Sequence, residues 1–429
     1  MLHTINGGNQ TVGEAIKRLV LGYIPSNRCN LRCKYCYISQ IKDWGEAKPA
    51  FQYPIQQMVA GLSKERLGGT AQINLTAQGE TLMVKDIDQL VEGLLRQGHF
   101  VELVTNGTVD RVIERLTRLP EELASHLMFK ISFHYEELVN RKMIDKFFAN
   151  VDKIKASPCS FTLEMVPYDE LEEKIEEIQE LCIQRAGACC HLTIGRKDDT
   201  VGRGLLTNHS HEEYLERWKP FDSRMFEVKM ELMDQKRREF CYAGDWSIFL
   251  NFQTGEIQPC YGQPVVQNIW EDISKPIRFQ PVGHCCTQPY CINGHAHLTF
   301  GVIPSLELGS YAQIRNRVCA DGTHWLKEEV RDFYSGKLAE SHTLLTQQQE
   351  KKATRRYRIS SACQWIKNPE KIIAQAKRQS RKLTGKLSGK TAKASLYGTL
   401  HAGGCRYAVA VCRAFQHGCT QRQYLQQPF

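Results

Sequence analysis

The stretch VLGYIPSNRCNLRCKYCYIS, residues 20–39, joins an apolar segment to a loop with three cysteines. Residues 20–24 have the continuous apolar character of a buried strand. Cys29, Cys33 and Cys36 follow with the spacing C-x3-C-x2-C. A tetrahedral metal site normally has four ligands, so either a distant cysteine completes this set or one position stays open for another molecule. Three thiolates on one short loop suit an iron–sulfur cluster, and a zinc site is the alternative.

Strand-like and helix-like segments alternate from residue 20 to about residue 196. Repeated strand–helix units predict an α/β fold with a parallel sheet, either doubly wound or closed as a barrel. In both cases the functional residues gather at the C-terminal ends of the strands, where the three cysteines stand. Further strands are expected at 72–76, 100–105, 128–133, 161–166 and 191–195, and helices at 84–97, 109–117, about 140–155 and 169–185.

The composition is that of an ordinary globular protein, with 42% hydrophobic and 24% charged residues among 429. The first 25 residues show no secretory signal, and no apolar run approaches the roughly 18–20 residues of a membrane-spanning helix. A cytoplasmic location is therefore expected. In that compartment the 17 cysteines point to metal or redox chemistry more than to disulfides.

The positive charge belongs to the end of the chain. Residues 351–429 contain seventeen Lys or Arg and a single acid, Glu370, so residues 1–350 are left with a net charge of −7. We expect this segment to be a basic, partly disordered tail with some helical character. Contact with an anionic membrane surface is possible but not favoured, and the scarcity of aromatic residues argues against nucleic-acid binding.

With Tyr35 between the last two cysteines, the loop reads C-x3-C-x-aromatic-C, and the chain resembles the radical S-adenosylmethionine (SAM) enzymes. The resemblance implies a partial (β/α)6 TIM-like barrel over residues 1–200. It also implies that Cys29, Cys33 and Cys36 hold a [4Fe-4S] cluster. SAM would bind the open iron through its amino and carboxylate groups, so the missing fourth ligand would be the cosubstrate.

The same resemblance implies a SAM pocket at the strand ends. Gln78-Gly79-Glu80 stands where the family often has Gly-Gly-Glu, and Thr105-Asn106-Gly107 matches another common family segment. Polar side chains at the ends of the fourth to sixth strands, His134 among them, would hold the ribose and the carboxylate. The expected SAM contacts are Tyr35, Gln78, Gly79, Glu80, Asn106, Ser132, Glu164 and Arg196.

A second cysteine-rich region occupies residues 241–303. Its start, from Cys241 through Gly255 to Cys260, resembles the C-x9–15-G-x4-C pattern of auxiliary-cluster (SPASM or twitch-like) modules, and WSIFLNFQTGEIQPC predicts a β-hairpin. Five cysteines in this window favour a one-cluster version, with structural zinc as the alternative. The expected auxiliary ligands are Cys241, Cys260, Cys286 and Cys291, with Cys285 possible in place of Cys286.

The remaining segments complete the expected organisation. Residues 201–240 would be a helical connector and 304–350 a helical extension. His284, His295 and His297 could act as ligands, although we expect them to be exposed. The other cysteines of the body are expected to be small buried apolar residues: Cys159, Cys182, Cys189, Cys190 and Cys319.

These features favour a radical SAM enzyme that abstracts hydrogen from a peptide or protein substrate, because auxiliary modules of this type are common in peptide-modifying members of the family. The alternative within the enzymes is the same chemistry on a carbohydrate or other small molecule, such as alcohol dehydrogenation. A non-catalytic iron–sulfur or zinc scaffold, or an electron carrier, is the alternative of another class. The enzyme would need an electron donor such as a ferredoxin or flavodoxin.

Overall fold

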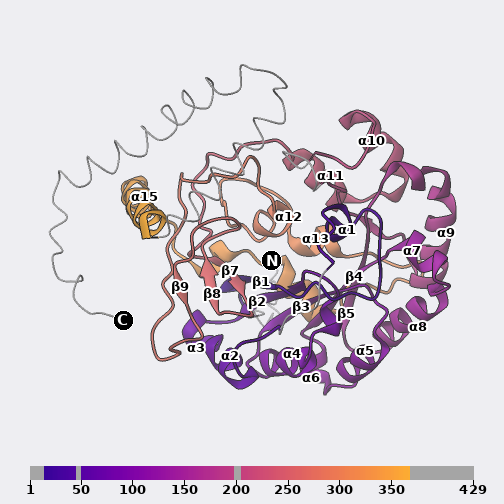
Figure 1. Cartoon of the computed structure of the whole chain (residues 1–429), viewed down its shortest axis with the longest axis horizontal. Coiled ribbons are helices and arrows are strands. Elements are labelled where there is room, and N and C mark those ends of the chain that lie inside the picture. The colour runs from indigo at the N-terminus through magenta and orange to yellow at the C-terminus, as the bar shows by residue number, and fades with distance from the viewer. Residues whose placement is uncertain (1–13, 45–49, 198–203, 368–429) are drawn as a thin grey trace, which may run out of the picture. The chain divides into compact units, whose positions relative to one another are not determined.

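The structure is a computed structural model, and it describes residues 14–44, 50–197 and 204–367 (Figure 1). The chain divides into two compact units, Met1–Ala353 and Thr354–Phe429. Of the basic tail, only residues 351–367 are described, as part of the helix α15 (Gln347–Lys367). The predictions for residues 368–429 lie outside the described residues.

A nine-stranded sheet with the order β6-β5-β4-β3-β2-β1-β7-β8-β9 forms the centre of the first unit. Strands β1 to β6 lie side by side in chain order and are all parallel. The α/β fold with a parallel sheet, expected from the alternating pattern, is confirmed, and so is the partial TIM-like barrel that the family resemblance implies. The strands are β1 Arg18–Ile24, β2 Ala71–Ala77, β3 Phe100–Thr105, β4 Leu127–Ser132, β5 Ser160–Met165 and β6 His191–Leu192.

The cysteine-rich region continues this sheet. Strand β7 (Ser247–Asn251) pairs in parallel with β1 along its whole length. Strand β8 (Glu256–Gln258) turns back antiparallel to β7, and β9 (Gln267–Asn268) follows, so the expected hairpin is present. The residues around the second cysteine group are therefore attached to the edge of β1, the strand that leads into the first cysteine loop.

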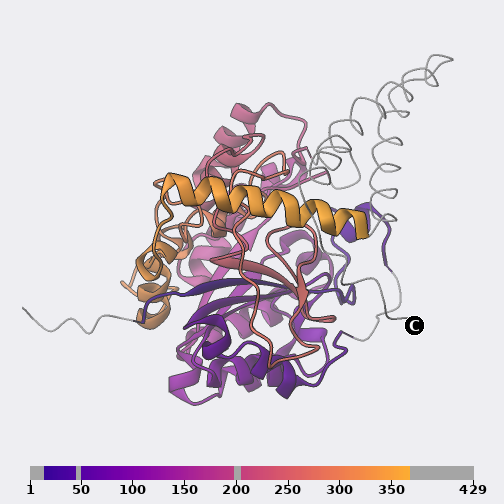
Figure 2. The ribbon, with the colours of Figure 1, turned by 90° about the vertical axis from the view of Figure 1, so that its left-hand side faces the viewer.

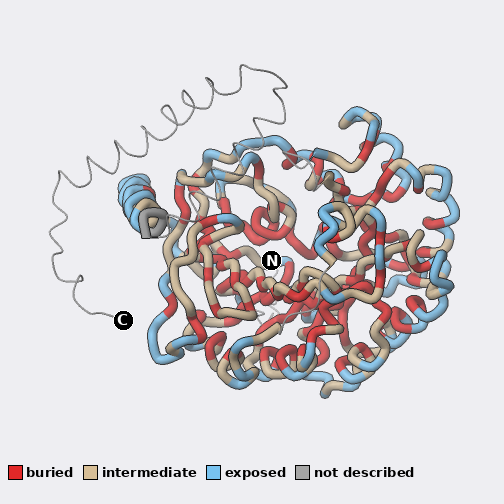
Figure 3. Tube along the Cα trace, in the orientation of Figure 1, coloured by how far each residue is buried: buried red, intermediate tan, exposed pale blue. Residues whose placement is uncertain are grey.

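Helices cover the outer side of the strands, as Figure 1 shows for α4, α5, α6 and α8, and Figure 2 shows the same helices from another side. Their inward faces are apolar and buried: Ile87, Leu90, Val91 and Leu94 form one stripe on α4. The exposed residues lie mainly on the outer surface (Figure 3). These helices are α1 Tyr37–Gln40, α2 Ile55–Gly61, α3 Lys64–Leu67, η1 Thr81–Met83, α4 Ile87–Arg96, α5 Asp110–Thr117, α6 Glu121–Ala124, α7 Tyr135–Asn140, α8 Ile144–Lys155, η2 Asp169–Lys174 and α9 Ile175–Ala186.

The connector and the extension are helical, as the sequence predicts, and the extension packs back on the barrel. The backbone N–H of Phe161, at the start of β5, donates to the carbonyl of Trp325, and the N–H of Lys327 donates to the hydroxyl of Ser160. The extension thereby covers the N-terminal end of β5. The connector holds α10 His211–Trp218, η3 Lys219–Phe221 and α11 Arg224–Leu232, and the extension holds α13 Tyr311–Arg315, α14 Glu328–Ser335 and η4 Leu338–Ser341; α12 Gly294–His297 belongs to the cysteine-rich region between them.

In the part of the chain that the structure describes, no helix combines the length and the apolar character needed to span a bilayer.

His99 joins β2 to the outer helices and generates a pH prediction. Its ring is fully buried; Nδ1 accepts from the N–H of Ala71 at 3.1 Å, and Nε2 donates to the carbonyl of Leu62 at 2.7 Å. Only the neutral ring can make both bonds, and burial lowers the pKa of His99 to about 4, well below the ordinary value of 6.5.

Because the folded state favours neutral His99, its contribution to stability is complete above pH 6.5 and is lost as the pH falls from 6.5 towards 4. We expect this loss to be about 3 kcal/mol. In His99→Gln, urea denaturation across this range should show a correspondingly smaller decrease in the free energy of unfolding. His211→Gln, at the partly exposed start of α10, is the control and should keep the wild-type slope. An unchanged slope in His99→Gln would contradict the assignment.

Candidate functional site

The first cysteine loop lies against the segment that follows β2. Three further backbone hydrogen bonds join the segments that follow β1 and β2. The N–H groups of residues 78, 79 and 80 donate to the carbonyls of residues 24, 26 and 28 at 2.7–2.9 Å. These bonds carry the β1–β2 pairing forward to the residue before Cys29. The position of the loop is thus set by main-chain pairing with its neighbour.

This pairing leaves no room for a side chain at residue 79. A Cβ atom there would lie 2.3 Å from the carbonyl oxygen of Arg28 and 2.7 Å from the carbonyl carbon of Asn27. Both neighbours are backbone atoms, which cannot rotate away. Gly79 is therefore required by the close approach of the two loops.

Glu80 ties the loop after β2 to the end of β3. Its buried carboxylate accepts hydrogen bonds from the Thr105 hydroxyl at 2.6 Å, the Asn106 N–H at 2.7 Å and the Leu82 N–H at 2.9 Å. Burial raises the pKa of Glu80, although all three hydrogen bonds act in the opposite direction. The carboxylate is thus committed to positioning the end of β3 beside the cysteine loop. Its expected contact with SAM stays a prediction.

Asn106 connects the end of β3 to the cysteine loop itself. Its side-chain amide donates to Asn30 Oδ1 at 2.8 Å and lies 3.8 Å from the Cys29 sulfur, which also accepts from the Leu31 N–H at 3.4 Å. Asn30 in turn donates to the Thr108 hydroxyl at 2.7 Å. Cys29 is thus presented with two N–H groups directed at its sulfur.

Tyr35 and Gln78, two other expected SAM contacts, also lie in the loop network. The Tyr35 hydroxyl is 2.5 Å from Nδ1 of His134, and burial lowers the pKa of His134 to about 4, so its ring is neutral. The Gln78 side chain donates to Asp43 at 2.9 Å, and the backbone carbonyl of Gln78 accepts from the Tyr37 hydroxyl at 2.6 Å. These contacts connect the cysteine loop to the ends of β2 and β4.

The three thiols of the loop influence one another electrostatically. The pKa of Cys33 is raised, first by burial and then by the charges of Cys36, Glu137 and Cys29. The pKa of Cys29 is also raised, again mainly by burial. A cation held among these sulfurs would lower the pKa values of the thiols, because it stabilises thiolates.

Glu164 and Ser132 end neighbouring strands, where their backbones are paired. The Glu164 carboxylate contacts the buried guanidinium of Arg315 and lies 3.4 Å from the Lys130 ammonium. Its charge is thus taken up by a buried ion pair inside the barrel. Contacts of Glu164 and Ser132 with SAM remain predictions.

Four cysteines of the second group surround one small cavity. Cys241, Cys260, Cys286 and Cys291 all line it, whereas Cys285 does not. Burial is the main cause of the raised pKa values of Cys241 and Cys291, and the other thiols of this set raise them further. The structure therefore brings together the four cysteines that the sequence singles out, with residue 286 in place of residue 285. We call these four residues the second cysteine set.

Two expectations for other residues are wrong. His297 is 3% exposed and His295 is half-buried, because α12 folds against α11 and places both in the interior. Cys189 is half-buried, since it stands in the turn between α9 and β6. The other cysteines that were expected to be small buried residues are buried: Cys159, Cys182, Cys190 and Cys319.

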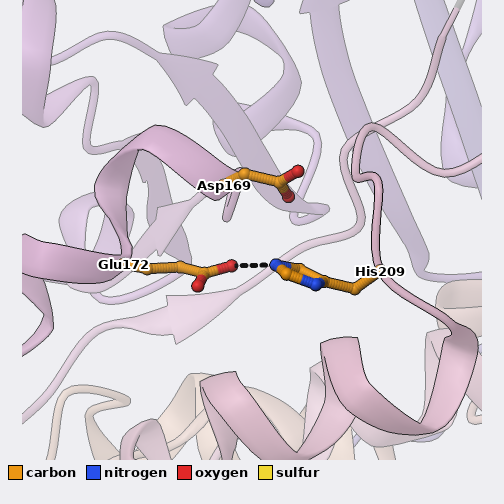
Figure 4. A group of neighbouring side chains, drawn as sticks. All are labelled: Asp169, Glu172 and His209. Atoms are coloured by element: carbon orange, nitrogen blue, oxygen red, sulfur yellow. Dashed lines mark hydrogen bonds and ion pairs between the residues drawn. The ribbon is translucent and has the colours of Figure 1, made fainter.

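A polar cluster holds the segment just before α10, and Figure 4 shows three of its members, Asp169, Glu172 and His209. His209 donates to Glu172 at 2.7 Å, Arg217 binds the other oxygen of Glu172 at 2.6 Å, and Asp169 accepts from the backbone of Asn208 at 2.8 Å. Asp169, Glu172 and His209 are spaced closely enough for a cation. The Arg217 guanidinium already neutralises Glu172, however, so the cluster serves to hold the chain before α10 against η2.

The interior of the barrel holds charged residues that the sequence reasoning missed. Glu102 in β3 accepts from Asn74 at 2.6 Å and from the Tyr311 hydroxyl at 2.6 Å, and Lys130 stands in β4. Lys229 of α11 binds the Thr193 hydroxyl. A charged residue in the middle of an apolar strand, as in FVELVT and MFKISF, is the signal that could have indicated two of them.

Comparison with known proteins gives a family match for part of the chain. Residues 23–182 match the model of the radical SAM superfamily. Streptococcus suis SuiB bound to S-adenosylmethionine is a similar solved structure, at 16% identity and a TM-score of 0.40, over 60% of this chain and 64% of that chain. Native anSMEcpe with bound AdoMet is another, at 14% identity and a TM-score of 0.42, over 60% of this chain and 80% of that chain.

Gly79→Ala should loosen the cysteine loop, because the added methyl group would meet the backbone of Arg28. We expect the free energy of unfolding to fall by about 1–3 kcal/mol, and Cys33 to be alkylated faster in the metal-free protein. Gly336→Ala is the matched control, since its Cβ would have ordinary contacts of 3.4 Å or more. Equal stability and equal alkylation rates in the two variants would show that the approach of the two loops is not tight.

Proposed function

We propose that this chain, whose residues 23–182 match the radical SAM superfamily model, is a radical SAM enzyme that abstracts a hydrogen atom from a peptide or protein substrate. The proposal rests chiefly on one observation. Three cysteines stand on a loop at the C-terminal end of β1, and main-chain pairing with residues 78–80 fixes that loop.

The residues of this loop fit a [4Fe-4S] cluster with an open position. Cysteine thiolates are the usual ligands of such clusters. The N–H groups of Leu31 and Asn106 directed at Cys29 stabilise a thiolate, and hydrogen bonds to ligand sulfurs are a normal means of adjusting these clusters. We propose Cys29, Cys33 and Cys36 as the three protein ligands.

Held by Cys29, Cys33 and Cys36, the cluster would supply the electron for reductive cleavage of SAM, and SAM would supply the group that abstracts hydrogen from the substrate. The protein's part is to orient the reactants and exclude competing reactions. Gly79 allows the backbone after β2 to approach the cysteine loop, and Glu80 and Asn106 hold the end of β3 beside it. Tyr35, braced by His134, fixes the second half of the loop.

We further propose that the second cysteine set holds an auxiliary cluster. Four thiols around one cavity match the number of ligands that a closed site needs, and the raised pKa values of these buried thiols show the penalty that a metal would remove. A cytoplasmic location, where thiols stay reduced, and an electron donor such as ferredoxin or flavodoxin complete the proposal.

A peptide is the substrate class that we favour. Among the similar solved structures, one is described as SuiB bound to the precursor peptide SuiA and another as anSMEcpe with bound AdoMet and Cp18Cys peptide. A carbohydrate or another small molecule is the alternative, and substrate screening on the reconstituted enzyme distinguishes the two.

Replacing Cys29, Cys33 and Cys36 together by Ala should abolish formation of 5′-deoxyadenosine. On anaerobically reconstituted protein we expect about eight irons in the wild type and about four in the triple variant. The nucleoside is measured by chromatography after dithionite and SAM are added. Zinc in place of iron, or unchanged cleavage in the triple variant, would refute the enzyme assignment and favour a metal scaffold or electron carrier.

The auxiliary ligands are separable by a matched pair of variants. Cys286→Ala should lose about four irons, because residue 286 lines the cavity, whereas the adjacent Cys285→Ala should keep the wild-type iron content. Iron and sulfide analysis of both proteins provides the measurement. Iron loss in Cys285→Ala alone would reverse the assignment of the pair.

A further inference from the structure

A second cavity, of about 90 Å³, lies beside the auxiliary site. Its wall comes from the end of β6, from α11 and from the segment that leads into α12. Arg196, Lys229 and His295 line it, and among the residues that the structure describes no acidic side chain does. We call it the cationic cavity. It has room for several waters or for one carboxylate or phosphate group, but not for a whole substrate.

The charges around the cationic cavity do not balance. The cations that act on one another there are Arg196, Lys229, Lys130 and Arg315. The opposing carboxylates are Glu102 and Glu164, and both already have partners: Asn74 and Tyr311 donate to Glu102, while Arg315 contacts Glu164 and Lys130 lies 3.4 Å from it. Two positive charges are left without a carboxylate among the described residues.

The pKa values of two lysines show that burial and the neighbouring positive charges disfavour their charged forms. Burial, followed by the charge of Arg315, lowers the pKa of Lys130 to about 7. The pKa of Lys229 is lowered well below its ordinary value, first by burial and then by Lys130 and Arg196. Each of these shifts would be reversed by an anion placed between the cations. A buried excess of one sign of charge is costly unless a counter-charge enters with it.

We propose that the cationic cavity binds an anionic group of the substrate, a carboxylate or a phosphate, through Lys229 and Arg196 with Lys130 behind them. That the anion belongs to the substrate rests on the proposed function; the anion site itself does not. Lys229 is held in place by Thr193, and Arg196 is fixed through its backbone carbonyl, which accepts from the side chain of Gln40 in α1 at 3.0 Å.

The position of the cavity favours the substrate over the carboxylate of SAM as the source of the anion. Cys291 lines both this cavity and that of the auxiliary site. The charged groups that act on Cys29 and Cys33 are different ones, namely Glu80, Arg32 and Glu137. An anion in the cationic cavity would therefore lie beside the second cysteine set.

Isothermal titration calorimetry on the reconstituted full-length protein, at pH 8 and without reductant, tests the proposal. Glutarate and inorganic phosphate are the anionic probes, and glutaramide is the neutral one. We expect saturable binding of at least one anion and none of glutaramide. Comparison of two buffers with different heats of ionisation should show proton uptake on binding, because the lysines regain their charge.

The variants locate the binding site. Lys229→Gln should weaken anion binding about tenfold or more, and Lys229→Arg should restore most of it. If Lys229→Gln fails to fold, Arg196→Gln is the second variant. Lys219→Gln, which removes an exposed lysine paired with Glu216, is the control and should bind like the wild type.

The outcomes are distinct. Tighter binding of glutarate than of phosphate indicates a carboxylate substrate, and tighter binding of phosphate indicates a phosphorylated one. Either result supports the proposal. Wild-type affinity in both Lys229→Gln and Arg196→Gln, or no saturable binding of either anion, would overturn it. If prior saturation with SAM prevents anion binding, the cavity holds the cosubstrate carboxylate and the proposal fails. SAM cleavage on the same preparation tests the proposed function separately.

Discussion

The hydrogen bonds between residues 24–28 and 78–80 are the constraint on which the rest of the site depends. They extend the β1–β2 pairing past the ends of both strands, so the cysteine loop leaves the sheet in a fixed direction. Gly79 permits this approach, and the carboxylate of Glu80, next in the chain, reaches the end of β3. Because the loop is positioned through its backbone, its cysteine side chains stay available for a metal.

Buried charge gives the barrel interior a different character from that of an apolar core. Arg315 and Tyr311 come from the extension after the cysteine-rich region, yet they contact Glu164 and Glu102 in the strands. Removing either partner would leave an uncompensated charge in the interior, which is strongly destabilising. The extension is therefore part of the barrel in energetic terms, because its Arg315 guanidinium and Tyr311 hydroxyl complete the partners of Glu164 and Glu102.

The sequence predicts what local patterns determine. Strand–helix alternation indicates a parallel sheet, and cysteine spacing indicates the two thiol groups, whereas the choice between Cys285 and Cys286 stays open in the sequence. It could not show that β7 joins the sheet beside β1, since that pairing unites segments more than 200 residues apart. Nor could it show that α12 buries His297. The interior charges were missed because their balance depends on which distant side chains meet.

The shared wall of the two cavities has a consequence for how the second site works. Gly294 packs so closely against Leu232 of α11 that a Cβ there would lie 2.6 Å from it, and 3.6 Å from the Cys291 sulfur. The segment from Cys291 to His295 therefore cannot move at one end without disturbing the other. Metal bound by Cys291 would fix the wall of the cationic cavity, and an anion held by Lys229 would restrain the same segment from its other side. On this geometry, the proposed auxiliary cluster and the proposed anion site would be coupled through one short piece of backbone.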